Sequence, residues 1–182
     1  MLNTEEIDKV NCFKSQSRKR EFIAIRVLCQ SIFGGKTIAY NCIGAPFIKG
    51  IANISISHAG NLAAIGVNDS FTIGLDLEKP RPNILELAPK FLSDNERNTI
   101  NCIDELLVTQ IWSCKEAMYK LAGRKQLIFA TDLLIETEED DSWRGRIINE
   151  DHELSFKLDI FEHEDTIVTL NASPVERIER YL

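Results

Sequence analysis

The sequence predicts an α+β fold of two similar lobes, each a helix packed on an antiparallel sheet. The order helix, then strand-rich block, occurs in residues 18–78 and again in 93–171, although no residue-level repeat is visible. Within each block strands follow one another directly, which favours antiparallel sheets. A chain of 182 residues, 44% of them hydrophobic, can bury one good core. We therefore expect one compact unit, with an N-terminal lobe at 1–82 and a C-terminal lobe at 83–182.

The N-terminal lobe begins with a polar stretch and one helix. Residues 1–17 have little periodicity and are expected to form a short helix or a loose arm. From residue 18 to residue 33 the apolar residues fit a helix, and Gly34 and Gly35 end it. Positive charge at the start of a helix is disfavoured by the helix dipole, so the basic cluster there is either a solvated end or an anion site. That cluster consists of Arg18, Lys19 and Arg20.

Strands are crowded between residues 37 and 78. In the last of them, apolar residues alternate with Thr72, Gly74, Asp76 and Glu78. A period of two predicts a half-buried strand, and the prolines that follow end it. The expected strands are Thr37–Cys42, Phe47–Ile48, Asn53–Ser57, Leu62–Val67 and Phe71–Glu78.

The C-terminal lobe is expected to begin with helices and to continue as strands. Ser93 and Glu96 have the spacing of a capping box, which opens a helical segment. The longest predicted helix is Glu105–Leu121, with Gly123 as its stop. The other expected elements are a helix at Ile84–Phe91, strands at Thr131–Glu136, Trp143–Ile148, Leu154–Phe161 and Thr166–Asn171, and a short helix at Pro174–Leu182.

Composition excludes several classes of function. A net charge of −7 disfavours nucleic-acid binding, because a phosphate backbone requires a basic surface. The sequence has no run of about 18 apolar residues and no signal-like N-terminus, so we expect no membrane association and a cytoplasmic location. The five cysteines are scattered without metal-site spacing, which predicts reduced, structural thiols rather than disulfides or zinc ligands.

Two stretches carry groups suited to chemistry. Asp76 and Glu78 project from one face of a strand, roughly 7 Å apart, where a hard divalent cation, Mg²⁺ before Ca²⁺, would offset their repulsion. Trp112, Glu116 and Lys120 are spaced four apart along one side of the longest helix. Each stretch taken alone also fits a plainer interpretation: solvated acids on an open sheet face, and a surface ion pair beside a core tryptophan.

Together, three blocks of sequence resemble the 4′-phosphopantetheinyl transferases. The resemblance is closer to the monomeric, internally duplicated branch, typified by the activator of surfactin synthetase, than to the small trimeric branch. The blocks are Ile-Ser-Ile-Ser-His-Ala-Gly at 54–60, Ile-Gly-Leu-Asp-Leu-Glu at 73–78 and Trp-Ser-Cys-Lys-Glu-Ala-x-x-Lys at 112–120. With weaker agreement around them, the match runs from about residue 18 to about residue 172.

The resemblance implies two lobes related by a pseudo-twofold axis, and a Mg²⁺-dependent reaction. The 4′-phosphopantetheine group of coenzyme A would be transferred to a serine of an apo acyl or peptidyl carrier protein, releasing 3′,5′-ADP. Asp76, Glu78 and Glu116 would hold the metal ion. Glu116, directly or through a metal-bound water, would be the general base, Lys120 would contact the phosphates, and Lys115 would be the acid.

The resemblance also implies a coenzyme A site in the N-terminal lobe. Ser57 and His58 would hold nucleotide phosphates, Asp76 would act through the metal on the pyrophosphate, and Arg18, Lys19 and Arg26 would add to the 3′-phosphate pocket. Ala45 stands where many members have a lysine at the nucleotide end, so coenzyme A affinity is expected to be weaker or supplied differently. A monomer is expected.

Two other functions stay open at this stage. One is a non-catalytic module that binds carrier protein or coenzyme A, and the other is a Mg²⁺-dependent phosphohydrolase that uses water as nucleophile. Retention of Asp76, Glu78, Glu116 and Lys120 together argues against the first.

Overall fold

The computed structural model describes residues 2–51, 53–123, 126–140 and 142–179. Helices and antiparallel strands are combined in one chain, which confirms the α+β class. The elements of the first half are α1 (Thr4–Cys12), α2 (Gln16–Phe33), β1 (Ile38–Tyr40), β2 (Pro46–Ile48), β3 (Asn53–Ala59), β4 (Leu62–Asn68) and β5 (Leu75–Glu78). Those of the second half are α3 (Ile84–Phe91), α4 (Asp94–Thr99), α5 (Glu105–Leu121), α6 (Phe129–Asp132), β6 (Leu133–Thr137), β7 (Trp143–Ile148), β8 (His152–His163), β9 (Thr166–Asn171) and β10 (Glu176–Glu179).

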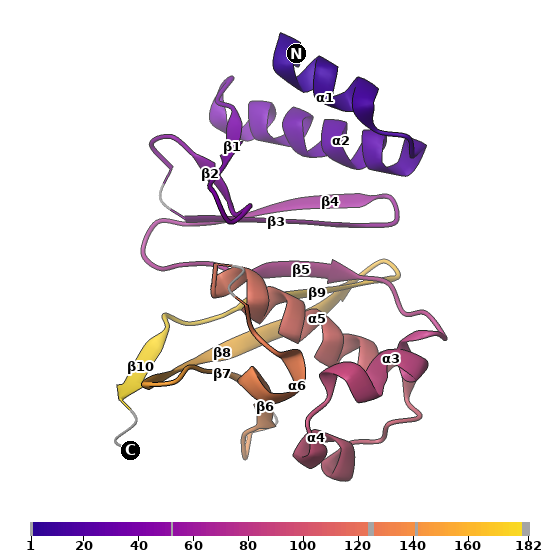
Figure 1. Ribbon diagram of the computed structural model, residues 1–182, viewed down its shortest axis with the longest axis vertical. Helices are drawn as coiled ribbons and strands as arrows, with labels where there is room; N and C mark the ends of the chain where they lie inside the picture. Colours follow the sequence, from indigo (N-terminus) through magenta and orange to yellow (C-terminus); the bar gives the residue numbers. More distant parts are fainter. Residues whose placement is uncertain (1, 52, 124–125, 141, 180–182) are drawn as a thin grey trace.

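The second half is built on a six-stranded antiparallel sheet. Its strand order is β5-β9-β8-β7-β6, with β10 paired to β8 as well. Helix α5 lies against this sheet (Figure 1) and buries its apolar side there. The core between them is formed by Cys114, Met118, Leu133, Ile147 and Phe156, all fully buried.

Before β5, the first half consists of two hairpins and two helices. Hairpins β1–β2 and β3–β4 are each antiparallel, and α2 lies over them with α1 beyond it (Figure 1). Ile25 and Cys29 of α2 pack against Ile38 and Ile48 of the first hairpin in a separate small core. Residues 1–17, which were expected to form a short helix or a loose arm, contain α1. A capping box between Asn3 and Glu6 stabilises the start of this helix.

Strand β5 joins the two halves of the chain. On one edge it pairs with β9, with Asp76 opposite Thr169. On its other edge, as far as the described residues show, no ladder forms with β3; instead the backbone N–H groups of Leu75 and Leu77 donate to the hydroxyls of Ser55 and Ser57, at 2.9 and 3.0 Å. The alternating serines of β3 thus replace backbone carbonyls as acceptors. The predicted lobe boundary after residue 82 and the pseudo-twofold relation stay predictions.

The sequence-based prediction was wrong about the strand that carries the two acids. Regular strand begins at Leu75 rather than Phe71, because the side chain of Asn171 holds the preceding segment: it accepts from the N–H of Gly74 and donates to the carbonyl of Thr72. The strand is also not half-buried. Asp76 is only 3% exposed, since α5 covers the face that carries it and the Ser57 hydroxyl of β3 binds it from the edge.

The end of the chain also differs from its prediction. Residues 176–179 form strand β10, antiparallel to β8, where a helix was expected over 174–182; residues 180–182 lie outside the described part. All five cysteines are free thiols. Among the described residues, no helix has both the length and the apolar character needed to cross a membrane.

Candidate active site

A cleft of about 580 Å³ lies between the helices of the first half and the acidic strand. Its first wall comes from α1, α2 and the β1–β2 hairpin, and its second from the ends of β3 and β5 and from Lys120 of α5. The volume is in the range of small-molecule sites. Of the residues predicted for the site, the cleft gathers Arg18, Arg26, Ser57, His58, Asp76, Glu78 and Lys120.

The carboxylate of Asp76 is held from three sides. Its Oδ1 accepts from the Lys120 ammonium at 2.7 Å and from the Ser57 hydroxyl at 3.0 Å. Its Oδ2 accepts from the hydroxyl of Ser113 at 3.0 Å. A buried carboxylate needs such hydrogen-bond partners to offset its loss of hydration. The side chain is therefore fixed in one orientation at the floor of the cleft.

Ser57 and Lys120 are fully engaged around Asp76. The Ser57 hydroxyl donates to Asp76 and accepts from the N–H of Leu77 and from Lys120. The Lys120 ammonium donates its three N–H groups to Ser57, Asp76 and the carbonyl of Leu75. Contact of either group with a phosphate would require one of these bonds to be exchanged.

Glu78 lies on the same wall of the cleft and is held by an aromatic cluster. Its Oε1 accepts from the indole N–H of Trp112 at 2.9 Å. The indole packs against the rings of Phe91 and Phe129, with centroids 4.9 and 5.4 Å away. Burial raises the pKa of Glu78, the charge of Asp76 raises it further, and the Trp112 hydrogen bond partly offsets both.

The raised pKa of Glu78 predicts a pH-dependent cost in stability. The pKa of Glu78 in the folded protein lies above its unfolded value, so the protonated side chain favours the folded state. This contribution to the free energy of unfolding is complete below about pH 4.5 and is lost as pH rises through the folded-state pKa. Glu78→Gln keeps an acceptor for Trp112 but removes the charge. We expect the variant to melt at a higher temperature than the parent at pH 8, with the difference shrinking toward pH 4.5. A difference independent of pH would contradict this cause.

Helix α5 lies against the acidic strand at backbone distance. A Cβ placed on Gly74 would come within 2.1 Å of the Ala117 carbonyl oxygen, so only glycine allows this approach. Glu116 immediately precedes Ala117 on the helix. It is one turn after Trp112, which binds Glu78, and one turn before Lys120, which binds Asp76. It is partly exposed, and it is not among the residues that line the cleft.

Lys115 lies away from the cleft. It is fully buried, and its ammonium donates to the Glu96 carboxylate at 2.7 Å and to the carbonyls of Phe91 and Phe129 at 2.7 and 3.0 Å. Burial lowers its pKa, an effect opposed by the charge of Glu96. The structure therefore does not bring the expected acid to the other site residues.

The basic wall of the cleft combines cations with aromatic rings. The guanidinium of Arg26 lies 3.5 Å from the centroid of the Phe22 ring, donates to the Tyr40 hydroxyl at 3.3 Å and approaches Glu6 to 3.5 Å. The buried Nε is the atom that approaches Glu6, and it makes no hydrogen bond within the described residues. Such a partly satisfied guanidinium suits an incoming anion.

The other predicted anion-binding residues differ in position. The His58 Nε2 atom lies 3.5 Å from the Glu21 carboxylate at the rim of the cleft, and Arg18 stands over the Phe13 ring with 5.8 Å to its centroid. Lys19 does not line the cleft.

Sequence reasoning missed two contributors to the site. Lys9 of α1 lines the cleft, with its ammonium 5.3 Å from the Tyr40 ring centroid, although residues 1–17 carried no motif. Ser113, buried in α5, binds Asp76. It stands within the Trp-Ser-Cys-Lys-Glu block, where its position between Trp112 and Glu116 was the available signal.

The carboxylate oxygens of Asp76 and Glu78 in the cleft suit a hard cation, and the three-acid set with Glu116 stays a prediction. Within the described residues, no group of three or more His, Cys, Asp or Glu side chains is close enough to hold a metal ion. Asp76 and Glu78 do share the cleft, and the charge of Asp76 contributes to the raised pKa of Glu78. Two carboxylates with substrate phosphates are a common set for Mg²⁺, so this pair fits the ion chemically.

Comparison with known proteins points to one family. The family model described as the 4′-phosphopantetheinyl transferase superfamily matches residues 72–171, which include Asp76, Glu78 and all of α5. The 4′-phosphopantetheinyl transferase HetI of Nostoc sp. is 30% identical over 141 residues, covering 67% of this chain and 60% of that protein.

Other relatives carry the same name. A putative 4′-phosphopantetheinyl transferase of Synechocystis sp. is 24% identical over 142 residues, 68% of this chain and 58% of that protein. The transferase Sfp of Bacillus subtilis is 36% identical over 87 residues, 44% of this chain and 38% of Sfp. The chain thus spans about 60% of the length of the first two relatives. With more than half of its residues matched by the family model, the chain belongs to the 4′-phosphopantetheinyl transferase superfamily.

Proposed function

We propose that this protein transfers the 4′-phosphopantetheine group of coenzyme A to a serine of an apo acyl or peptidyl carrier protein, with Mg²⁺, and releases 3′,5′-ADP. The observation that carries the proposal is the cleft itself, which sets a cationic, aromatic wall opposite Asp76, Glu78 and Lys120. A nucleotide with several phosphates and a bound cation needs both kinds of wall.

Coenzyme A would lie with its nucleotide phosphates toward the basic wall. Arg26 lines the cleft with its guanidinium, and Arg18 and His58 line the same cleft. Lys9 adds a cation near Tyr40, whose Cα partner across the hairpin is Pro46, next to Ala45. The positive charge expected at the nucleotide end is thereby supplied from α1.

Asp76 and Glu78 would hold the Mg²⁺ ion, with Glu116 as the proposed third ligand. When bound, such an ion supplies Lewis-acid polarisation of the phosphate and neutralises charge on the leaving group. The ordered Asp76 carboxylate, fixed by Ser57 and Ser113, preorganises this position.

In the reaction, the serine oxygen of the carrier protein forms a bond to the phosphorus that bears the pantetheine arm. The bond from that phosphorus to the bridging oxygen breaks, and the electron pair leaves with 3′,5′-ADP. Glu116 is the proposed acceptor of the serine proton, directly or through a water. Lys120 is the proposed donor of hydrogen bonds to the phosphates. Lys115 is not part of this proposal, because its ammonium is enclosed by Glu96 and two carbonyls.

A mass-shift assay tests the function. The full chain, coenzyme A, Mg²⁺ and an apo carrier protein are expected to yield holo carrier, and Glu116→Ala should slow the transfer by at least about 10²-fold, the usual range for a lost general base. Glu105→Ala, about three turns earlier on the same helix, is the matched control and should retain activity.

Two outcomes would replace the proposal by another function. Binding of coenzyme A without transfer to any apo carrier in a panel would indicate a binding module. Release of 3′,5′-ADP without an acceptor protein would indicate a phosphohydrolase.

A further inference from the structure

Two side chains of helix α5 bind the two oxygens of the Asp76 carboxylate, and they have opposite effects on its ability to bind a cation. Ser113 and Lys120 are seven residues apart, two helical turns, and so face the same side of the helix. The Ser113 hydroxyl donates to Oδ2 at 3.0 Å, and the Lys120 ammonium donates to Oδ1 at 2.7 Å. The first contact leaves the carboxylate charged and available, whereas the second neutralises it.

Ser113 has the properties of a positioning group. It is fully buried in the interior of α5, and the structure gives its hydroxyl no exposed surface on which to act. The Ser57 hydroxyl steadies the other carboxylate oxygen from β3 at 3.0 Å. Hydrogen bonds of this kind orient a metal-binding carboxylate, and their loss typically lowers metal affinity.

Lys120 has the properties of a resident counter-ion. Its three N–H groups are all bonded to protein acceptors, and its side chain is 13% exposed. A divalent cation at the same carboxylate would be repelled by an ammonium held 2.7 Å away. Occupation of the site by a cation and release of Lys120 are therefore linked.

We propose that Ser113 is a positioning residue that fixes Asp76 for a divalent cation, and that Lys120 competes with that cation for the same carboxylate until it is released. The released ammonium is then free to bind phosphate. Metal binding and phosphate binding are thereby coupled through one side chain. The inference rests on the proposed Mg²⁺ site. It concerns Ser113 and Lys120, which are not ligands of the ion in that proposal.

The test measures Mn²⁺ binding to the full chain by titration calorimetry and electron paramagnetic resonance, without coenzyme A or carrier protein. Ser113→Ala is expected to weaken Mn²⁺ binding by about tenfold. Lys120→Met is expected to tighten it by about fivefold or more. The two substitutions remove side chains that contact the same carboxylate from the same helix. A general loss of stability would not change Mn²⁺ affinity in opposite directions.

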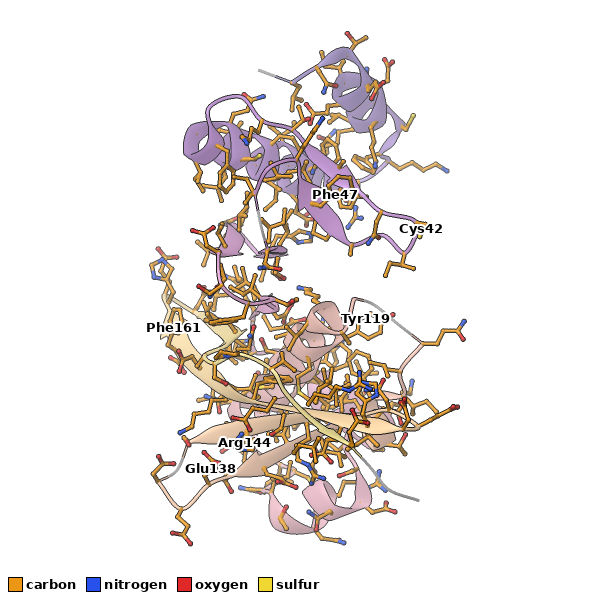
Figure 2. The ribbon with its side chains drawn as sticks, turned by 90° about the vertical axis from the view of Figure 1, so that its left-hand side faces the viewer. Cys42, Phe47, Tyr119, Glu138, Arg144 and Phe161 are labelled. Atoms are coloured by element: carbon orange, nitrogen blue, oxygen red, sulfur yellow. The ribbon has the colours of Figure 1, made fainter. Side chains whose placement is uncertain are left out.

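Matched controls remove equivalent groups far from the cleft. Ser142→Ala deletes a hydroxyl that binds the carboxylate of Glu138, and Lys157→Met deletes an ammonium 3.6 Å from the same carboxylate. Figure 2 places Glu138 with Arg144 in the lower part of the molecule, well away from Cys42 and Phe47 of the upper part. Both controls should leave Mn²⁺ affinity unchanged. Circular dichroism melts establish that every variant is folded at the titration temperature.

Several results would overturn the inference. These are equal Mn²⁺ affinity for the parent and Ser113→Ala, unchanged or weaker affinity for Lys120→Met, and binding by the parent no stronger than by Asp76→Asn. The transferase assay is read separately. If the protein forms holo carrier but gives one of these Mn²⁺ results, the inference fails and the proposed function stands. If the Mn²⁺ affinities change as expected but no transfer occurs, only the proposed function is overturned.

Discussion

Asp76→Asn is expected to lower the rate of phosphopantetheine transfer by about 10³-fold or more. The reason is that the substitution removes the one carboxylate that β3, β5 and α5 together hold in place, and with it the main ligand of the proposed cation. A metal ion supplies several kcal/mol of transition-state stabilisation, and about 4 kcal/mol corresponds to that factor. The measurement is the initial rate of holo carrier formation at saturating coenzyme A.

The asparagine keeps the size of the aspartate and one carbonyl oxygen to accept from Ser57 and Lys120, so the fold should persist. Asp159→Asn, an exposed acid on β8 of the same sheet, is the matched control and should retain the parent rate. An Asp76→Asn protein that transfers within a few-fold of the parent, while Glu116→Ala is inactive, would show that the cation is not held by Asp76.

Elements with a strong and regular pattern were predictable from the sequence. Helix α5 and strands β7 and β9 have the predicted bounds, because each is long or clearly periodic. The Ser93–Glu96 capping box also forms as expected, at the start of α4. In these cases local preference and tertiary packing agree.

The errors arose where tertiary contacts decide the outcome. The exposed β10 has no periodic apolar pattern, and only pairing with β8 makes it a strand. Alternation in Phe71–Glu78 predicted one open face, but the serines of β3 bind the free edge of β5 and α5 covers the site, so Asp76 is enclosed. The residue pattern of a single strand does not indicate which distant segments of the chain pack over it.

The sequence predicted several residues that lie together at the cleft, but not the contacts that each of them makes. The spacing of Trp112, Glu116 and Lys120 placed them on one helix face, and two of the three contact the acidic strand. Lys115 is one residue from Glu116, about 100° around the helix, which turns its side chain into the core. Lys9 was missed because a short polar helix shows its function only when packed beside α2.

Lys115→Met is expected to destabilise the protein by about 3–5 kcal/mol. Breaking a buried ion pair by removing one partner leaves the other charge uncompensated. Here the partner, Glu96, is also bound to the N–H groups of Ser93 and Ile135. Through this carboxylate and two carbonyls, Lys115 ties the ends of α3 and α4, helix α6 and strand β6 to α5.

Thermal unfolding followed by circular dichroism measures the effect. At about 2–4 °C per kcal/mol for a chain of this size, the melting temperature should fall by roughly 6–20 °C. Lys157→Met, at an exposed position on β8, should change the unfolding free energy by less than about 0.5 kcal/mol. Adding Glu96→Gln to Lys115→Met should recover part of the loss, because the buried carboxylate is then no longer charged.

The same variant separates a structural lysine from a catalytic one. Below its melting temperature, folded Lys115→Met should transfer phosphopantetheine at a rate close to that of the parent, since the ammonium lies outside the cleft. An unchanged melting temperature combined with lost transfer would restore the role of proton donor that the sequence motif implied for Lys115. Adjacent positions in one motif would then act on both sides of α5, and the enclosure of Lys115 by Glu96, Phe91 and Phe129 would have to open during each turnover.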